Sequence, residues 1–298
     1  MKKMLCLCLL AAAPWLAWAD LRVFATVPEW GALVKEIGGP HVSVYTATHA
    51  LQDPHRIEAR PSLLAQARRA DLLVATGADL EAGWLPLVRR DSGNGAIQSG
   101  QPGYFEAAAV VRLRDVPAAL DRARGDVHAA GNPHLHLDPA NVLKVGEVLA
   151  IRMGELDAAR AADYQAGFRA FAERWQAAID RWEKQAAPLK GVPVLAHHQS
   201  FAYLIHWLGM REVGLLEPKP GIEPTSGHLT ALLTRLQAQP AKMVLVAAYN
   251  SDKASQWIAG RSGLPVVLLP YTVGGTPAAG DLFALYDDSL QRLLQALR

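Results

Sequence analysis

Residues 131–139, Gly-Asn-Pro-His-Leu-His-Leu-Asp-Pro, close the first half of the chain and lead into its most strongly helical part. They place two histidines, His134 and His136, just ahead of Pro139, and proline is favoured at the first position of a helix. Imidazoles in such a position can turn into a cleft, where nitrogen ligands suit a divalent transition metal. The stretch therefore predicts one wall of a metal-binding cleft.

Strands and helices alternate on both sides of this stretch. In the first half, strands are expected at 21–26, 41–46 and 71–77, and helices at 27–38, 61–69 and 81–90. In the second half, strands are expected at 192–196, 243–247 and 264–269, and helices at 199–208, 225–239, 251–262 (capped by Ser251) and 281–297. The pattern predicts an α/β fold with two Rossmann-like lobes and a crevice between them, where such folds bind ligands.

A long helix is expected between the two lobes. Residues 141–155 have a helical composition, and 159–186 are rich in Ala, Glu, Arg and Gln with no Gly or Pro after Gly167. At 1.5 Å per residue the second segment would be about 40 Å long, the scale of a domain. We therefore expect an N-terminal lobe at 20–157, a rigid connecting helix at 158–188 and a C-terminal lobe at 189–298, with the metal site in the cleft.

The first residues have the pattern of a secretory signal peptide. Lys2 and Lys3 precede an apolar run over 4–16, and Ala17-Trp18-Ala19 fits a small-x-small cleavage site. A membrane anchor is the alternative, but the run is shorter than the ~20 residues that a spanning helix needs. The pattern predicts a signal peptide at 1–19 and a mature chain that begins at Asp20 in the periplasm.

Cysteine content and charge restrict what the mature chain can do. Cys6 and Cys8 both lie in the predicted signal peptide, so a metal site in the mature chain must use nitrogen and oxygen ligands. Without Lys2 and Lys3 the formal charge falls from +2 to zero. A neutral chain gives no electrostatic reason to expect nucleic acid or an anionic membrane surface as a partner.

Three further segments offer ligands for the same cleft. His55 follows Asp53 and Pro54 in a polar loop, His197 and His198 directly follow an apolar strand, and Asp281 opens a helix. Each has an ordinary alternative: a solvated loop histidine, a packed histidine, or an aspartate that caps its helix. Neighbouring residues of a strand point to opposite sides, so only one histidine of the 197–198 pair is expected to face the crevice.

As a set, these segments resemble the cluster A-I solute-binding proteins of bacterial zinc and manganese ABC transporters, over nearly the whole mature chain. Residues 53–58 (Asp-Pro-His-Arg-Ile-Glu) and 132–139 resemble the first two ligand motifs of that family, and 272–282 resembles the segment with its final aspartate. His198 falls where zinc-type members have histidine. The resemblance implies a site of three imidazoles and one carboxylate: His55, His134, His198 and Asp281.

The resemblance also implies a function and its partners. The protein would capture zinc in the periplasm and deliver it, as a monomer, to an inner-membrane ABC permease with its cytoplasmic ATPase. Three imidazoles favour Zn²⁺ over Mn²⁺, which prefers oxygen ligands. The alternatives are a manganese or iron carrier of the same fold, an adhesin, and a zinc-dependent hydrolase in which Asp281 is a general base.

Two departures from the family pattern concern histidines. His136 stands where the family commonly has tryptophan, so it is either a packing substitute or an accessory ligand. The long His- and Asp-rich loop of zinc-type members is absent, and His128 is either a remnant of that metal-capture function or a surface histidine. The other histidines, His41, His49, His206 and His228, are expected to be structural or exposed.

Overall fold

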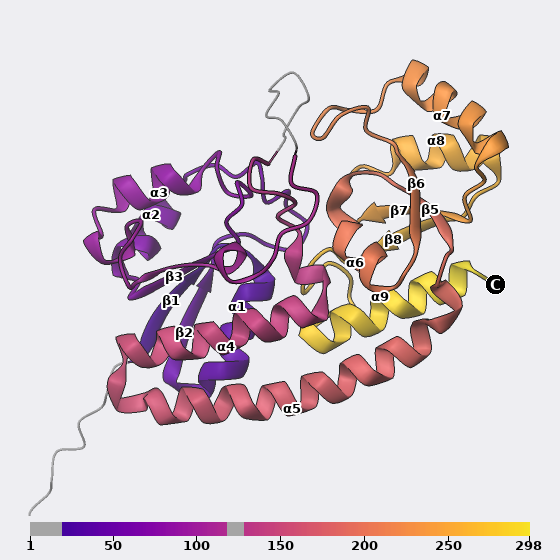
Figure 1. The fold of residues 1–298 in the computed structure, drawn as a ribbon. Coiled ribbons are helices and arrows are strands. Elements are labelled where there is room, and N and C mark those ends of the chain that lie inside the picture. Colours follow the sequence, from indigo (N-terminus) through magenta and orange to yellow (C-terminus); the bar gives the residue numbers. More distant parts are fainter. Residues whose placement is uncertain (1–19, 118–127) are drawn as a thin grey trace, which may run out of the picture.

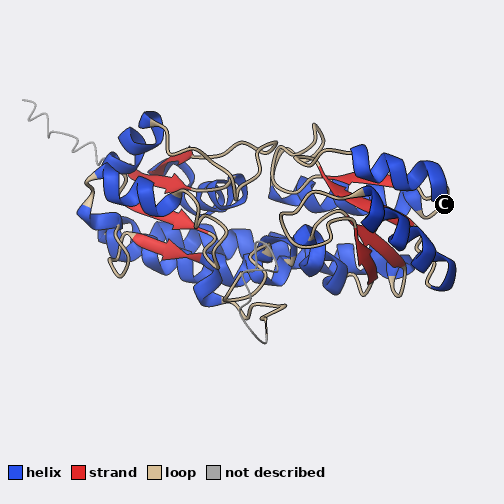
Figure 2. Ribbon diagram, turned by 90° about the horizontal axis from the view of Figure 1, so that it is seen from above, coloured by secondary structure: helices blue, strands red, loops and turns tan. Residues whose placement is uncertain are grey.

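The computed structural model describes residues 20–117 and 128–298 as two α/β lobes that lie side by side above a long helix (Figure 1). Seen from above, the two sheets stand apart and loops from both lobes meet between them (Figure 2). The predicted signal peptide at 1–19 lies outside the described residues. Within those described ranges, no helix combines the length and the apolar composition that crossing a membrane requires.

The N-terminal lobe is built on a four-stranded parallel sheet with the strand order β2-β1-β3-β4. Its elements are β1 (Leu21–Ala25), α1 (Pro28–Gly38), β2 (Val42–Thr46), α2 (Pro61–Arg69), β3 (Leu72–Ala75), α3 (Leu85–Ser92) and β4 (Tyr104–Glu106). All of β3 is buried, as expected for a parallel strand that is covered on both faces.

The C-terminal lobe repeats this plan, with a parallel sheet in the order β6-β5-β7-β8. Its elements are β5 (Pro193–Ala196), α6 (Ala202–Trp207), β6 (Arg211–Leu215), α7 (Ser226–Ala238), β7 (Met243–Ala247), α8 (Lys253–Ser262), β8 (Val266–Leu269) and α9 (Leu282–Ala296). In both lobes the first strand lies inside the sheet, between the second and third strands of the chain order. The predicted α/β architecture with two parallel-sheet lobes is confirmed.

Several local predictions differ from the structure. The short strands β4 and β6 were not expected, and the helix predicted at 81–90 begins only at Leu85. Residues 78–84 instead form a turn, in which Ala78 and Asp79 have positive φ angles. Ser251 does not cap α8, because the N-cap is Asp252 and no side-chain hydrogen bond is made there. Thr225 does cap α7, where its hydroxyl accepts a hydrogen bond from the His228 N–H.

The connecting helix is α5 (Ala161–Ala186), which runs beneath both lobes (Figure 1). It packs against α1 and against α4 (Pro139–Leu156) of the N-terminal lobe, and against α9 of the C-terminal lobe. Contact with α1 is so close that a Cβ on Gly167 would lie 2.0 Å from the Ile37 carbonyl oxygen. Glycine is therefore required where the two helices cross.

Aromatic side chains fasten α5 to the C-terminal lobe. The Trp182 ring stacks on Tyr286 of α9 at a centroid distance of 4.8 Å, and Trp175 meets Phe283 edge-on at 4.9 Å. The Trp175 indole also donates a hydrogen bond to the Pro139 carbonyl oxygen at the start of α4. Both tryptophans belong to one hydrophobic core that extends through both lobes. The helix is therefore part of the core, and this packing restricts how far the lobes can separate.

Candidate metal centre

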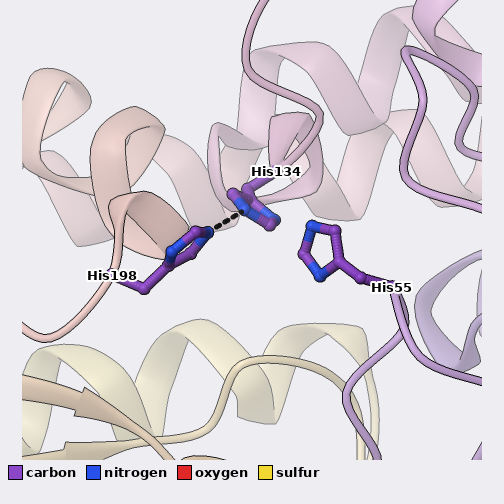
Figure 3. A group of neighbouring side chains, drawn as sticks. All are labelled: His55, His134 and His198. Atoms are coloured by element: carbon purple, nitrogen blue, oxygen red, sulfur yellow. Dashed lines mark hydrogen bonds between the residues drawn. The ribbon is translucent and has the colours of Figure 1, made fainter. Parts of the chain in front are cut away.

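Three histidines from separate segments meet between the lobes. His55 lies in the loop after β2, His134 immediately precedes the 3₁₀ turn Leu135–Leu137 before α4, and His198 follows β5. Each offers a ring nitrogen, and these nitrogens all lie within 4.8 Å of one another. Figure 3 shows the three rings turned toward a common centre, with the Nε2 atoms of His134 and His198 3.4 Å apart. The structure thus brings together three of the predicted ligands.

In each ring, Nδ1 is the nitrogen that points away from the common centre, here called the far nitrogen. Each of these Nδ1 atoms has its own partner. Nδ1 of His55 lies 2.8 Å from Asp53 Oδ1, and Nδ1 of His198 lies 2.7 Å from Glu217 Oε2. A carboxylate only accepts hydrogen bonds, so both Nδ1 atoms carry a proton, and in the neutral ring Nε2 is the nitrogen that keeps a lone pair for a metal. His55 Nε2 is buried and has no hydrogen-bond partner among the described residues. The rings are therefore oriented as metal ligands are.

His134 is held at the centre of the group. Its Nδ1 lies 2.7 Å from the Tyr271 hydroxyl, and its backbone N–H donates to Asn132 Oδ1 at 2.9 Å. The Asn132 side chain also donates a hydrogen bond across the cleft to the carbonyl oxygen of Gln199, next to His198. One asparagine therefore fixes the N-terminal motif against the C-terminal one.

The spacing of the nitrogens fits a small tetrahedral ion. Two ligands that are each about 2.0–2.1 Å from such an ion lie about 3.4 Å apart. This is the distance between the Nε2 atoms of His134 and His198. Two imidazole nitrogens can share a proton in a hydrogen bond at this distance, and the same spacing fits both as ligands of one bound cation.

Burial keeps the central ring neutral. Desolvation lowers the pKa of His134 well below its ordinary value of 6.5, and the neighbouring imidazoles of His55 and His198 lower it further. Burial acts to raise the pKa of Asp53, but hydrogen bonding and charge from His55 outweigh it and leave this pKa below the ordinary value. A neutral imidazole and an ionised partner are the forms that metal binding requires.

Asp281 does not join the three histidines. It is the N-cap of α9, where its Oδ1 accepts a hydrogen bond from the Ala284 N–H at 2.8 Å. It lines a different cavity, of about 740 Å³, together with Lys35 of α1 and His49. The structure therefore gives Asp281 its alternative role, because its carboxylate satisfies the exposed N–H groups that begin the helix.

His136 is buried between α1 and the C-terminal lobe. Its side chain is completely buried, with Nε2 2.8 Å from the Tyr271 carbonyl oxygen and Nδ1 3.2 Å from a carboxylate oxygen of Glu29. The Tyr286 hydroxyl donates to the His136 carbonyl oxygen. These contacts join α1 to the C-terminal lobe, but only Nε2 has a hydrogen-bond partner among the described residues, whereas Nδ1 lies near Glu29 without forming a hydrogen bond. The burial and contacts of His136 support its packing role.

The sequence did not indicate Glu217, Tyr271 or Asn132 as residues that hold the ligands. Glu217 lies 19 residues after His198, and Tyr271 lies 137 residues after His134, so no local spacing links them. Asn132 belongs to the segment 131–139, and its position two residues before His134 is typical of an Asx turn. This turn is therefore a local feature that the sequence itself indicates.

The sequence matches the family described as zinc-uptake complex component A, periplasmic, over residues 23–297. A related protein is the high-affinity zinc uptake system protein ZnuA of Paracoccus denitrificans, 23% identical over 93% of this chain and 90% of that protein. The manganese ABC transporter substrate-binding lipoprotein PsaA of Streptococcus pneumoniae is 20% identical over 85% of this chain and 80% of that protein. Relatives named for zinc and for manganese therefore both occur.

Solved structures show the same fold. A crystal structure of ZnuA superposes with a TM-score of 0.75 at 23% identity and covers 94% of this chain and 100% of its own. FpvC from Pseudomonas aeruginosa in complex with Mn²⁺ superposes with a TM-score of 0.77 at 23% identity, over 93% of this chain and 98% of its own. The chain therefore belongs to the family of zinc-uptake complex component A, and it is a metal-binding substrate-binding protein of an ABC transporter, not an enzyme.

Proposed function

We propose that this protein captures Zn²⁺ in the periplasm and delivers it to an inner-membrane ABC permease with its ATPase. The observation that carries the proposal is the convergence of three imidazole nitrogens, with the far nitrogen of each ring held by Asp53, Tyr271 or Glu217. The ligands are His55, His134 and His198. Asp281 is not part of this set.

The donor set supports zinc over manganese. Neutral imidazoles suit zinc, nickel and copper, whereas manganese prefers carboxylate, carbonyl and water oxygens. The two carboxylates beside the site, Asp53 and Glu217, are turned to the far nitrogens of His55 and His198. A manganese carrier remains the second candidate, because relatives of similar identity are named for manganese and FpvC was solved with Mn²⁺.

The division of the ligands between the lobes supports release by lobe movement. His55 and His134 precede α5, and His198 follows it. Separation of the lobes would therefore remove a C-terminal ligand from an ion held on the N-terminal side. Delivery to the permease would use this movement, within the limit that the shared core sets.

Competition between the two metals tests the proposal. Tag-free protein stripped of metal is titrated with Zn²⁺ and Mn²⁺, separately and together. We expect one zinc ion per chain and displacement of manganese by zinc. His134→Ala should lose most of the affinity, and His206→Ala, which removes an exposed histidine of α6, should retain it. Preferential binding of manganese would favour the second candidate.

The periplasmic location rests on the predicted signal peptide. Lys2, Lys3 and the apolar run that follows should direct export, and cleavage after Ala19 should leave Asp20 as the first residue. Mass spectrometry of the protein isolated from a periplasmic extract measures this directly. A mature chain that still carries the first 19 residues would contradict the assignment. We propose a monomer, which sedimentation of the same material would test.

A further inference from the structure

The three histidines leave one corner of a tetrahedral site to be filled. A zinc site that is closed by protein has four protein ligands, whereas an open one holds water at the fourth position. Asp53 and Glu217 are engaged with the far nitrogens of His55 and His198, and Asp281 caps α9. A fourth ligand from the protein would therefore come from elsewhere on the cleft wall.

The His128 ring lies beside the rings of His55 and His134. Its centroid is 5.3 Å from that of His55 and 6.4 Å from that of His134. Within the group of three, the corresponding distances are 5.4, 5.4 and 5.9 Å. Two imidazoles bound to one tetrahedral ion have centroids roughly 5 Å apart, given a metal–nitrogen distance of about 2.0–2.1 Å. The His55–His128 pair already has this separation, and His128 would have to move about 1 Å toward His134 and also toward His198 to complete the group.

The backbone around His128 is anchored to the N-terminal lobe. The Ala129 N–H donates to Asp79 Oδ2 at 3.0 Å, and the Gly131 N–H donates to the His128 carbonyl oxygen at 3.2 Å. Gly131 has a φ of 121°, and a Cβ there would lie 2.7 Å from the Arg114 carbonyl oxygen. Since this turn leads directly into the motif of His134, the two rings are carried on one fixed segment.

We propose that His128 is the fourth ligand, so that four imidazoles hold the transported ion. The proposal deepens the proposed function and rests on it. Three of the ligands would then belong to the N-terminal lobe and only His198 to the C-terminal lobe. An all-nitrogen set disfavours manganese more strongly than three imidazoles and a water molecule would. It also excludes an exchangeable water from the bound ion.

Zinc-edge X-ray absorption spectroscopy on protein loaded with one equivalent of zinc tests the assignment. The wild type should show four imidazole nitrogens, and His128→Ala should show three nitrogens and one oxygen. Zinc affinity of the variant should fall roughly tenfold or more, the scale of losing one supporting group at a metal site. His49→Ala, which removes an exposed loop histidine outside the group, should keep the wild-type spectrum and affinity.

The outcomes separate this proposal from the proposed function. Three nitrogens and one oxygen in both the wild type and His128→Ala would overturn the role of His128 and leave a zinc carrier with an open position. No stoichiometric zinc binding in the wild type would overturn both. Metal-free melting curves of His128→Ala and His128→Gln should match the wild type, and a loss of affinity accompanied by unfolding would count against a ligand role.

Discussion

Each metal-binding histidine depends on a partner residue at its far nitrogen. Such partners fix the tautomer and the direction of the ring, and their loss at metal sites costs tenfold to a hundredfold in affinity. Glu217 has two roles, because its Oε2 accepts from the His198 ring at 2.7 Å and from the Gly221 N–H at 2.9 Å. It therefore connects the direction of one ligand to the fold of the loop beside it.

Glu217→Gln should weaken zinc binding roughly tenfold to a hundredfold while the stoichiometry stays at one. The glutamine side chain lacks the negative charge that, in Glu217, favours the Nδ1–H tautomer of His198. Competition with a chromophoric chelator measures the affinity. Glu223→Gln is the matched control, since Glu223 lines the same small cavity but forms no hydrogen bond or ion pair with the three ligands in the described part of the chain. Equal losses in the two variants would show that only the charge of the cavity matters.

A buried carboxylate in the N-terminal lobe should make stability depend on pH. Burial raises the pKa of Glu81 from 4.5 to about 7, although Thr26 and the N–H groups of Thr76 and Gly77 donate hydrogen bonds to it. The folded state binds the Glu81 proton more tightly than the unfolded state does. The resulting stabilisation of the fold is complete below the unfolded pKa of 4.5 and is lost as the pH rises through 7.

Relative to Glu81→Gln, the wild type should lose about 3 kcal/mol of unfolding free energy between pH 4.5 and pH 8. Urea denaturation of the metal-free proteins at these two pH values gives the difference. The exposed substitution Glu147→Gln corrects for general charge effects. A difference between wild type and Glu81→Gln that is the same at both pH values would contradict the raised pKa.

Short motifs predicted the three histidines because each stands at a fixed place in a recognisable segment. The fourth predicted ligand, Asp281, has the same sequence signal whether it binds metal or caps a helix. The two roles are distinguished only in the structure, where the Asp281 carboxylate accepts a hydrogen bond from the Ala284 N–H. Glu217 and Tyr271 could not be assigned from sequence, because their partners come from remote parts of the fold.

At the scale of elements, periodicity predicted the long helices and the buried strands. It did not predict β4 and β6, because β4 has only three residues and β6 is only half-buried, so neither has a clear apolar pattern. Helix ends depended on local hydrogen bonds, as the turn before α3 shows. The packing of α5 against α1 was also hidden from sequence, since the role of Gly167 follows from a neighbouring backbone.

Gly167→Ala should destabilise the protein by about 1–3 kcal/mol, the usual cost of overpacking. The added methyl group would clash with the Ile37 carbonyl oxygen and push α1 away from α5. Gly260→Ala in the exposed part of α8 is the control, because nothing lies within 4 Å of its Cβ position. That change should stabilise by up to about 1 kcal/mol through helix propensity. Urea unfolding measures both, and equal effects would contradict the close crossing.

At the scale of the whole molecule, a series of contacts crosses the mouth of the cleft near the ligands. The Arg56 guanidinium donates a hydrogen bond to the Gly221 carbonyl oxygen of the other lobe at 3.0 Å. Gly221 in turn donates to Glu217, which holds His198. Asp53, which orients His55, lies 3.9 Å from the same guanidinium. Closure of the lobes and orientation of the ligands are therefore coupled.

Arg56→Ala should accelerate zinc loss severalfold and change the equilibrium affinity less, because the same contact slows both entry and exit. The effect should be moderate, since the guanidinium is largely exposed and a single exposed contact is worth roughly 1 kcal/mol or less. Stopped-flow transfer of zinc to an excess of chelator measures the rate. Arg60→Ala, an exposed arginine at the start of α2, should leave it unchanged. Equal rates for wild type and Arg56→Ala would contradict the coupling.

The central claim is that a transported ion binds where the imidazoles of His55, His134 and His198 converge. A crystal structure of the zinc-loaded protein with anomalous data at the zinc edge tests it most directly. The account predicts one strong anomalous peak between the lobes, with the Nε2 atoms of all three histidines about 2.0–2.1 Å away. A peak beside Asp281 or at any other position, with these three nitrogens uncoordinated, would contradict it.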